Sequence, residues 1–395
     1  MDLLDEAQQL FPYTRLNRRT LHRHPELAFK EFNTAKLVAS ELSKLGLEVS
    51  GGFGVTGVVA EIEGAFDGPT IALRFDMDAL PIQEQNPVDY ISEIPGCMHA
   101  CGHDAHVAIG LSVAHLLEKH KAELHGKVRL FFQPGEEGAG GAEAFIADGG
   151  MGLPLPEAIF GLHVWNEKPV GWLGVAEGPI MAGSSSFTIQ ISGKGGHGAI
   201  PHLSADPIVA MANLITAAQS IVSRNTDPTD AGVLSFCAVH GGEAFNVIPQ
   251  SVTLKGTIRS FDQNVGTLIR DRLTDISHHV CSGLGCSASI EFIENTLPVI
   301  NDHRTTNIVA NVCTQLFPQM QLDRQGMTTM GAEDFASFLA RIPGTFFFVG
   351  SNNPQKGIIH GHHHPQFDID EESLVPAVAI MAGVALRYGV DTPIA

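Results

Sequence analysis

The stretch Met98–His106, which reads MHACGHDAH, combines three histidines with one cysteine and one aspartate. Cys101 and His103 are separated by a single glycine, so an extended backbone would point both side chains the same way. A thiolate and an imidazole are good zinc ligands, with bonds of about 2.3 and 2.1 Å. Asp104 precedes a helical pattern, where it could serve as an N-cap or as a residue that orients a ligand. The stretch therefore predicts part of a metal site.

Other segments carry possible ligands at the ends of apparent strands. Glu136 and Glu137 are adjacent in QPGEEG, GLHVW places His163 at the expected end of another strand, and HGHHHPQF supplies His360 and His362–His364. Each signal alone is weak, because a lone histidine on an apolar strand is more often a core residue and adjacent glutamates are usually solvated. Several such segments at strand ends of one sheet would meet at the same edge. Together they predict a metal centre.

The two adjacent glutamates suggest a division of labour, because neighbouring side chains diverge. One can bind metal while the other faces the metal-bound water, whose pKa zinc lowers to about 7. A nearby carboxylate can take the proton of that water and deliver it to a leaving amine. These are the parts of a metal-dependent amide hydrolase.

Bulk properties narrow the class of protein. A chain of 395 residues is too long for one ordinary core, so two domains are expected. A hydrophobic content of 44% is typical of a folded protein. The net charge of -19 argues against a nucleic-acid partner, because phosphate binding depends on clustered Lys and Arg.

The N-terminal sequence MDLLDEAQQLFPYTRLNRR has acids before its first base and no long apolar run. It predicts neither a secretion signal nor a membrane span, so a cytoplasmic location is expected. In that reducing compartment the cysteines should be free thiols, inert core residues or metal ligands: residues 97, 101, 237, 281, 286 and 313.

Strand-like and helix-like patterns alternate through most of the chain. A helix is predicted within 34–47 from its three-to-four apolar spacing. Short apolar, β-rich runs predict buried strands at 70–78, 127–137, 158–165 and 344–350, with helices at 105–120 and 141–150. This alternation predicts an α/β fold with a parallel or mixed sheet covered on both faces.

The middle of the chain follows a different order. It reads strand, helix, strand, strand, helix, strand at 185–193, 205–224, 232–242, 250–262, 263–281 and 287–295. That βαββαβ order is typical of the ferredoxin-like α+β pattern. We therefore expect residues 181–295 to be a second domain inserted into a catalytic domain of residues 1–180 and 296–395.

Sequence blocks along nearly the whole chain resemble the signatures of one family. It is the dinuclear zinc-peptidase family of N-acyl-amino-acid amidohydrolases, which includes aminoacylases, hippurate hydrolases and plant auxin-conjugate hydrolases. The blocks stand in the family's order: LHRHPELAFKE (21–31), RFDMDALPI (74–82), MHACGHDAH, FFQPGEEGAGGA (131–142), GLHVW, GKGGHGAIPH (193–202), NVIPQSVTLKGTIRSFD (246–262), GAEDFA (331–336) and HHPQFDIDEE (363–372).

The resemblance implies a centre of two divalent metal ions. Zinc is expected because of the cysteine ligand, with manganese, cobalt and nickel as alternatives. His363 is chosen from its run because the family ligand lies two residues before the proline, here Pro365. Cys101 is the candidate for a bridging ligand. The implied ligands are Cys101, His103, Glu137, His163 and His363.

The resemblance also implies roles outside the metal ligands. Glu136 would be the general base and acid, and Asp78, preferred over Asp76, would orient the site. In this family the inserted domain mediates dimerisation and contributes to substrate binding. A homodimer is therefore expected, with a tetramer as the alternative.

Three residues of the insert match family positions that bind substrate. His197 would stabilise the tetrahedral oxyanion, in an active site that is expected to be the partner's. Asn246 would contact the substrate, and Arg259 would hold the α-carboxylate of a small N-acyl amino acid. The alternative for Arg259 is a surface salt bridge. The identity of the acyl group stays open.

Other functions fit the same residues. Cys101 could be a nucleophile with a histidine partner, in which case metal removal would leave activity intact. The cluster could also only stabilise a non-catalytic metal-binding protein, although Glu136, spare for binding and beside a ligand, speaks against this. Within the family, a dipeptidase or carboxypeptidase is the alternative to an N-acyl-amino-acid hydrolase.

Overall fold

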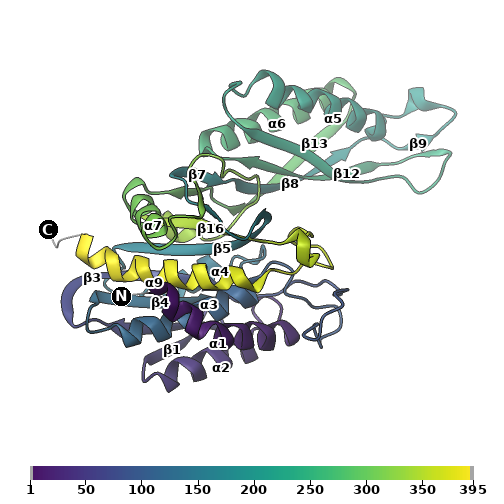
Figure 1. Ribbon diagram of the computed structural model, residues 1–395. Helices are drawn as coiled ribbons and strands as arrows, with labels where there is room; N and C mark the ends of the chain where they lie inside the picture. The colour runs from purple at the N-terminus through teal and green to yellow at the C-terminus, as the bar shows by residue number, and fades with distance from the viewer. Residues whose placement is uncertain (1–2, 392–395) are drawn as a thin grey trace. The chain divides into compact units, whose positions relative to one another are not determined.

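The computed structural model describes residues 3–391 and divides the chain into two compact units (Figure 1). The predicted insert, residues 181–295, lies within the second unit. The first unit runs to Gly178 and continues through Ile300–Met327 and from Asp334 onwards, and the second unit comprises Pro179–Val299 and Thr328–Glu333.

The short segment Thr328–Glu333 differs from the expectation that everything after residue 295 belongs to the catalytic domain. The backbone N–H of Ala182 donates to Thr329 O at 3.2 Å and to Gly331 O at 3.0 Å. These bonds attach the segment to the start of the second unit, and no local sequence pattern indicates such a distant pairing.

An eight-stranded mixed sheet forms the centre of the first unit, in the order β1-β2-β4-β3-β5-β16-β6-β15. The neighbours among β4, β3, β5 and β16 are parallel, whereas β1–β2, β2–β4 and β16–β6 are antiparallel. The prediction of a mixed α/β sheet is confirmed. The strands are β1 (Glu48–Phe53), β2 (Gly57–Glu63), β3 (Phe66–Asp76), β4 (His125–Gln133), β5 (Ala158–Pro169), β6 (Trp172–Gly174), β15 (Gln321–Asp323) and β16 (Gly344–Asn352).

Helices cover the sheet of the first unit. Figure 1 shows α9 running along the sheet. Helices α1 and α3 pack on α9, and α4 and α8 pack on each other. The 3-10 turns η2 (Pro354–Lys356) and η3 (Glu371–Ser373) also belong to this unit, whereas η1 (Pro201–Leu203) lies in the second unit. The helices are α1 (Leu3–Arg23), α2 (Phe32–Lys44), α3 (His103–Lys119), α4 (Gly141–Ala147), α7 (His303–Leu316), α8 (Ala336–Leu339) and α9 (Leu374–Asp391).

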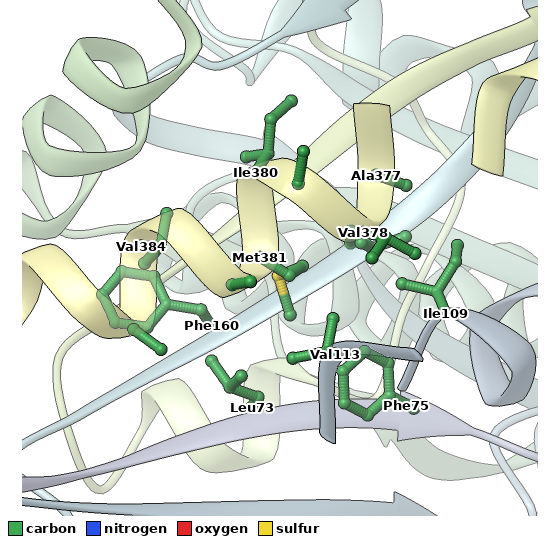
Figure 2. Packing of buried hydrophobic residues seen from close by; sticks show 14 of the residues in the cluster. Leu73, Phe75, Ile109, Val113, Phe160, Ala377, Val378, Ile380, Met381 and Val384 are labelled. Carbon is green, nitrogen blue, oxygen red and sulfur yellow. The ribbon is translucent and has the colours of Figure 1, made fainter. Parts of the chain in front are cut away.

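The core of the first unit lies between α3, α9 and the sheet. Figure 2 shows Leu73 and Phe75 of β3 and Phe160 of β5 facing Val113 of α3 and Met381 of α9. All five side chains are at most 1% exposed. Burial of such side chains is the main favourable term in folding, at roughly 1.5–3 kcal/mol each.

One helical segment, Glu371–Val390, is long and apolar enough to cross a membrane. It lies mostly within α9, and 83% of its apolar window is buried inside the protein. A helix that is apolar all round is expected at the centre of a core. The composition of α9 is therefore weak evidence for a membrane span.

The second unit contains a four-stranded antiparallel sheet in the order β10-β12-β8-β13. This order and the βαββαβ sequence are those of the predicted ferredoxin-like pattern. Two short strands, β9 and β11, pair beside it. The elements are β8 (Gly183–Ser192), β9 (Gly196–His197), α5 (Pro207–Arg224), β10 (Gly232–His240), β11 (Val247–Ile248), β12 (Ser251–Ser260), α6 (Gln263–Gly283) and β13 (Ser287–Thr296). The short strands β7 (Gly178–Met181) and β14 (Val299–Asn301) lie where the chain passes from one unit to the other.

The buried role of α9 can be tested by truncating one side chain. Ile380→Ala should lower the free energy of unfolding by about 2–5 kcal/mol, because Ile380 is 0% exposed. Val390→Ala, at a site that is 55% exposed in the same helix, should change it by less than about 0.5 kcal/mol. Urea unfolding followed by circular dichroism measures both. Equal effects of the two substitutions would contradict the core assignment.

Candidate metal centre

The predicted site residues lie on neighbouring parallel strands and on the loops that follow them. Asp78 follows β3, and Glu136 and Glu137 follow β4. The expectation that His163 ends a strand is wrong, because His163 lies in the middle of β5, which continues to Pro169. His103 begins α3. Because β4, β3 and β5 are parallel neighbours, these side chains meet at one edge of the sheet, where α/β sheets bind ligands.

Three groups of side chains that lie wholly within the first unit bring possible ligand atoms within 4.8 Å of one another. They contain four of the predicted ligands, and they add His106 and His362. The fifth predicted ligand, His363, lies next to the same cluster, with its Nε2 3.2 Å from Glu137 Oε1. The groups are Cys101 with His163 and His362, His103 with His106 and His163, and Cys101 with His103 and Glu137.

His106 has no ring nitrogen left for a metal. Its Nε2 accepts the backbone N–H of Val164 at 3.1 Å, and its Nδ1 lies 2.5 Å from Asp76 Oδ1. Burial lowers the pKa of His106, which favours the neutral ring with a single N–H. That hydrogen must be on Nδ1, donating to Asp76, because Nε2 is an acceptor. His106 therefore links β3 to β5 and does not act as a ligand.

His362 has a similar arrangement. Its Nε2 accepts the backbone N–H of Asn166 at 3.3 Å, and its Nδ1 lies 3.8 Å from Cys101 Sγ. Burial lowers the pKa of His362 to about 3, so the ring is neutral. The hydrogen on Nδ1 then points at the sulfur of Cys101, so His362 is a donor to that residue and has no free lone pair for a metal.

His103 and His163 are arranged as ligands. His103 Nδ1 donates to Asp78 O at 2.9 Å and His163 Nδ1 donates to Val164 O at 2.6 Å. A carbonyl that holds Nδ1–H fixes the tautomer and leaves Nε2 for a metal. His103 Nε2 is buried with no hydrogen-bond partner among residues 3–391, and His163 Nε2 lies 3.5 Å from Cys101 Sγ. These orphaned donor atoms fit a metal ion.

His363 has unusual backbone geometry. Its φ of 66° lies in the left-handed region, which is uncommon for a residue other than glycine and is found most often at functional sites. Its backbone N–H donates to Ala100 O at 2.8 Å, which joins the histidine run to the segment before Cys101.

His360 and His364 stack on each other with ring centroids 4.1 Å apart and an interplanar angle of 4°. Parallel stacked rings cannot point in-plane lone pairs at one ion. This pair therefore does not form a metal site in the observed arrangement.

The electrostatic surroundings favour positive charge. Burial, reinforced by the carboxylates of Glu137, Glu136 and Asp76, holds the pKa of the Cys101 thiol well above its ordinary value. Burial opposes a charge on His103, yet Asp76 and neighbouring carboxylates raise its pKa to about 10. Divalent cations would supply the positive charge that these surroundings stabilise.

Asp78 organises the turn that carries the two glutamates. Its Oδ1 accepts the backbone N–H of Glu136 and its Oδ2 accepts that of Glu137, each at 3.0 Å. The Glu136 side chain is half-buried, with Oε1 3.4 Å from the backbone N of Asp334. The same turn thus directs Glu137 to the ligand cluster and Glu136 to a neighbouring position.

The structure places the three predicted substrate-binding residues on the second unit. His197 in β9 is paired with Val247 in β11, next to Asn246, and both predicted residues are exposed. Arg259 in β12 is half-buried and donates to Thr257 Oγ1 and Ile258 O. Among residues 3–391 no carboxylate forms an ion pair with Arg259, so the alternative of a surface salt bridge is not observed.

The sequence reasoning missed the buried polar residues that support this edge. Asp334 accepts hydrogen bonds from Arg74 Nη2 at 3.0 Å, Gln133 Nε2 at 2.9 Å and Ala142 N at 2.8 Å. Arg74 also binds Asp76. The signal was present as a charged residue inside the apolar run TIALRFDMD, since a buried charge requires partners.

Comparison with known proteins gives consistent matches. The model of Peptidase family M20/M25/M40 matches residues 72–387. The Arabidopsis thaliana protein IAA-amino acid hydrolase ILR1-like 4 is 42% identical over 376 residues, which cover 94% of this chain and 84% of the relative. Thermostable carboxypeptidase 1 of Saccharolobus solfataricus is 40% identical over 375 residues, which cover 94% of each chain.

A solved structure extends the likeness to the fold. The crystal structure of the Bacillus subtilis YXEP protein, described as a dinuclear metal binding peptidase from the M20 family, matches with a TM-score of 0.86. The two chains are 35% identical, and the match covers 98% of this chain and 100% of the other.

The role of Asp78 gives a prediction for metal binding. Asp78→Asn replaces one acceptor oxygen by a donor, so the turn should lose a backbone hydrogen bond and zinc affinity should fall by about 10- to 100-fold. Asp148→Asn is the matched control, because Asp148 also accepts a backbone N–H, that of Gly54 at 2.8 Å, outside the cluster. Competition with a chromophoric chelator measures affinity. Equal affinities of the two variants would refute the assigned role.

Proposed function

This chain belongs to the peptidase family M20/M25/M40, and from that premise we propose that it hydrolyses the amide bond of N-acyl amino acids. Membership confirms the resemblance seen in the sequence and the prediction of a metal-dependent amidohydrolase. The observation that carries the proposal is the turn in which Asp78 holds Glu136 and Glu137 beside a Cys/His cluster.

The donor set fits two divalent ions. The hydrogen bonds of the ring nitrogens favour His103 and His163 as ligands and disfavour His106 and His362. The cysteine makes zinc the expected metal, with manganese, cobalt and nickel as alternatives. When bound, such ions polarise the amide carbonyl and lower the pKa of a water molecule. The residues that would hold them are Cys101, His103, Glu137, His163 and His363, with Cys101 as the candidate bridge.

Glu136 is the proposed general base and acid. Its carboxylate takes the proton of the attacking water and then gives that proton to the leaving nitrogen. The C–N bond breaks, and the products are a carboxylate and a free amino acid. Asp78 keeps Glu136 in place through the peptide N–H and does not itself need to exchange a proton.

The second unit supplies the proposed substrate contacts. His197 would stabilise the oxyanion, Asn246 would contact the substrate, and Arg259 would bind the α-carboxylate with two parallel hydrogen bonds. A half-buried guanidinium that lacks an acid partner among residues 3–391 supports this role for Arg259. A homodimer whose second unit completes the partner's site, and a cytoplasmic location, stay predictions.

Three alternative functions are ranked by specific observations. A carboxypeptidase of the same family is the second candidate, because one relative at 40% identity bears that name. A thiol hydrolase is disfavoured, because burial and nearby carboxylates raise the pKa of Cys101 and keep the thiol protonated. A non-catalytic metal-binding protein leaves Glu136 without a role.

The proposed reaction can be tested with a panel of N-acetyl, N-benzoyl, indole-acetyl and longer N-acyl amino acids. Release of free amino acid should stop when a chelator removes the metal and return when metal is added back. Elemental analysis verifies each state. Full activity in demonstrably metal-free protein would overturn the mechanism and point to Cys101, whereas turnover of dipeptides alone would favour the carboxypeptidase alternative.

The role of Glu136 predicts a separation of binding from turnover. Glu136→Gln should lower kcat by about 100- to 10,000-fold, because the amide cannot accept the proton. Zinc content should stay at the wild-type value, because Glu136 is not one of the proposed ligands. Glu143→Gln, at an exposed glutamate of α4, should leave both unchanged. Retention of wild-type kcat by Glu136→Gln would exclude this residue as the base.

A further inference from the structure

Arg18 of α1 is a fully buried cation that faces three carboxylates. Its Nε lies 2.9 Å from Asp104 Oδ2, its Nη2 2.6 Å from Asp368 Oδ1, and its Nη1 3.3 Å from Glu371 Oε1. The side chain is 0% exposed.

His22, one helical turn after Arg18, extends this contact. Its Nδ1 lies 2.7 Å from Asp104 Oδ2 and its Nε2 3.1 Å from Glu84 Oε1. Burial opposes a charge on His22, but Asp104 outweighs it and raises the pKa of His22 to about 9. Two cations from one helix thus contact the carboxylate of Asp104.

Two of the carboxylates bound by Arg18, those of Asp104 and Asp368, belong to segments that carry proposed ligands. Asp104 directly follows His103, and Asp368 lies five residues after His363. The Asp368 carboxylate is held further by Tyr90 OH at 2.6 Å and by its neighbour Ile369 N at 2.8 Å.

A second route from α1 reaches the same C-terminal segment. Glu84, the partner of His22, accepts a hydrogen bond from Asn86 Nδ2 at 3.0 Å. The same amide also donates to Phe367 O at 2.7 Å. The contacts of Arg18 and His22 therefore converge on residues 367 and 368 by separate paths.

Stability alone does not account for this network. Removal of several charged groups from water costs several kcal/mol per ion, and well-packed apolar residues often do as well or better. Apolar residues cannot hold two loops in a fixed position by hydrogen bonds. A guanidinium can hold them, because its N–H donors lie in one rigid plane.

We propose that Arg18 is a positioning residue for the metal centre, which joins the segment of Cys101 and His103 to the segment of His363 through Asp104 and Asp368. This inference rests on the metal-dependent function proposed above. Arg18 touches neither a proposed ligand side chain nor substrate. It acts through backbone segments, so its loss should displace ligands while leaving them chemically intact.

The test compares metal affinity in variants of the full chain. Arg18→Met and the milder Arg18→Lys should bind zinc about 10- to 100-fold more weakly in competition with a chromophoric chelator. Arg18→Lys should lose less zinc affinity than Arg18→Met, because the lysine ammonium keeps the positive charge but lacks the planar donors of arginine. The visible spectrum of the cobalt-loaded variants should shift, since it reports ligand geometry.

Two control variants separate positioning from general destabilisation. Arg19→Gln removes the neighbouring arginine, which binds Glu371 at 2.9 and 2.7 Å but neither Asp104 nor Asp368. Arg129→Met removes a buried arginine that binds Glu61 and the backbone O of Met151, outside the network. Both should keep zinc affinity within about 3-fold of wild type and an unchanged cobalt spectrum.

Two results would overturn the inference. One is a wild-type zinc affinity and cobalt spectrum in folded Arg18→Met, and the other is a loss of zinc affinity in Arg129→Met that equals the loss in Arg18→Met. If Arg18→Met fails to fold, Arg18→Lys and His22→Gln decide by the same measurements. A wild-type protein that binds zinc but hydrolyses no N-acyl amino acid would reject the proposed function while leaving this comparison valid.

Discussion

Asp78 makes three contacts on which the geometry of the site depends. Its carboxylate accepts the N–H groups of Glu136 and Glu137, and its backbone O accepts His103 Nδ1–H. These contacts are possible because β3 and β4 are parallel neighbours whose carboxyl ends coincide. Asp78 binds the backbone N–H groups of Glu136 and Glu137 and not their carboxylates, so both glutamate side chains stay available for a metal ion or a proton. Adjacent residues then diverge, so one turn can supply a ligand and a base.

Two buried arginines neutralise carboxylates close to this turn. Asp76 and Asp334 are neutralised by Arg74, and Asp104 and Asp368 by Arg18. Burial and the carboxylates of Glu137, Glu136 and Asp76 raise the pKa of the Cys101 thiol, so negative charge gathers where cations are expected to bind.

The sequence predicted the elements whose patterns are local. Apolar runs indicated β3, β4, β5 and β16, and alternating runs indicated strands β8, β10, β12 and β13, because burial and strand alternation are encoded in neighbouring residues. The sequence did not predict that Thr328–Glu333 joins the second unit, nor that Arg18 contacts Asp104 and Asp368. Arg18 is 86 positions from Asp104 and 350 from Asp368, and no periodic pattern indicates contacts at such separations.

The histidine run shows how geometry adds to a motif. Counting back from Pro365 selects His363, but the count alone gives no physical reason to reject its neighbours. The structure gives such reasons. His362 uses its Nε2 lone pair to accept a backbone N–H, and the parallel rings of His360 and His364 cannot both point a lone pair at one ion. His363 instead directs Nε2 at Glu137 and has the left-handed backbone that places it there. The position of His363 two residues before Pro365 and the occupied lone pair of His362 are independent observations, and both favour His363 as the ligand.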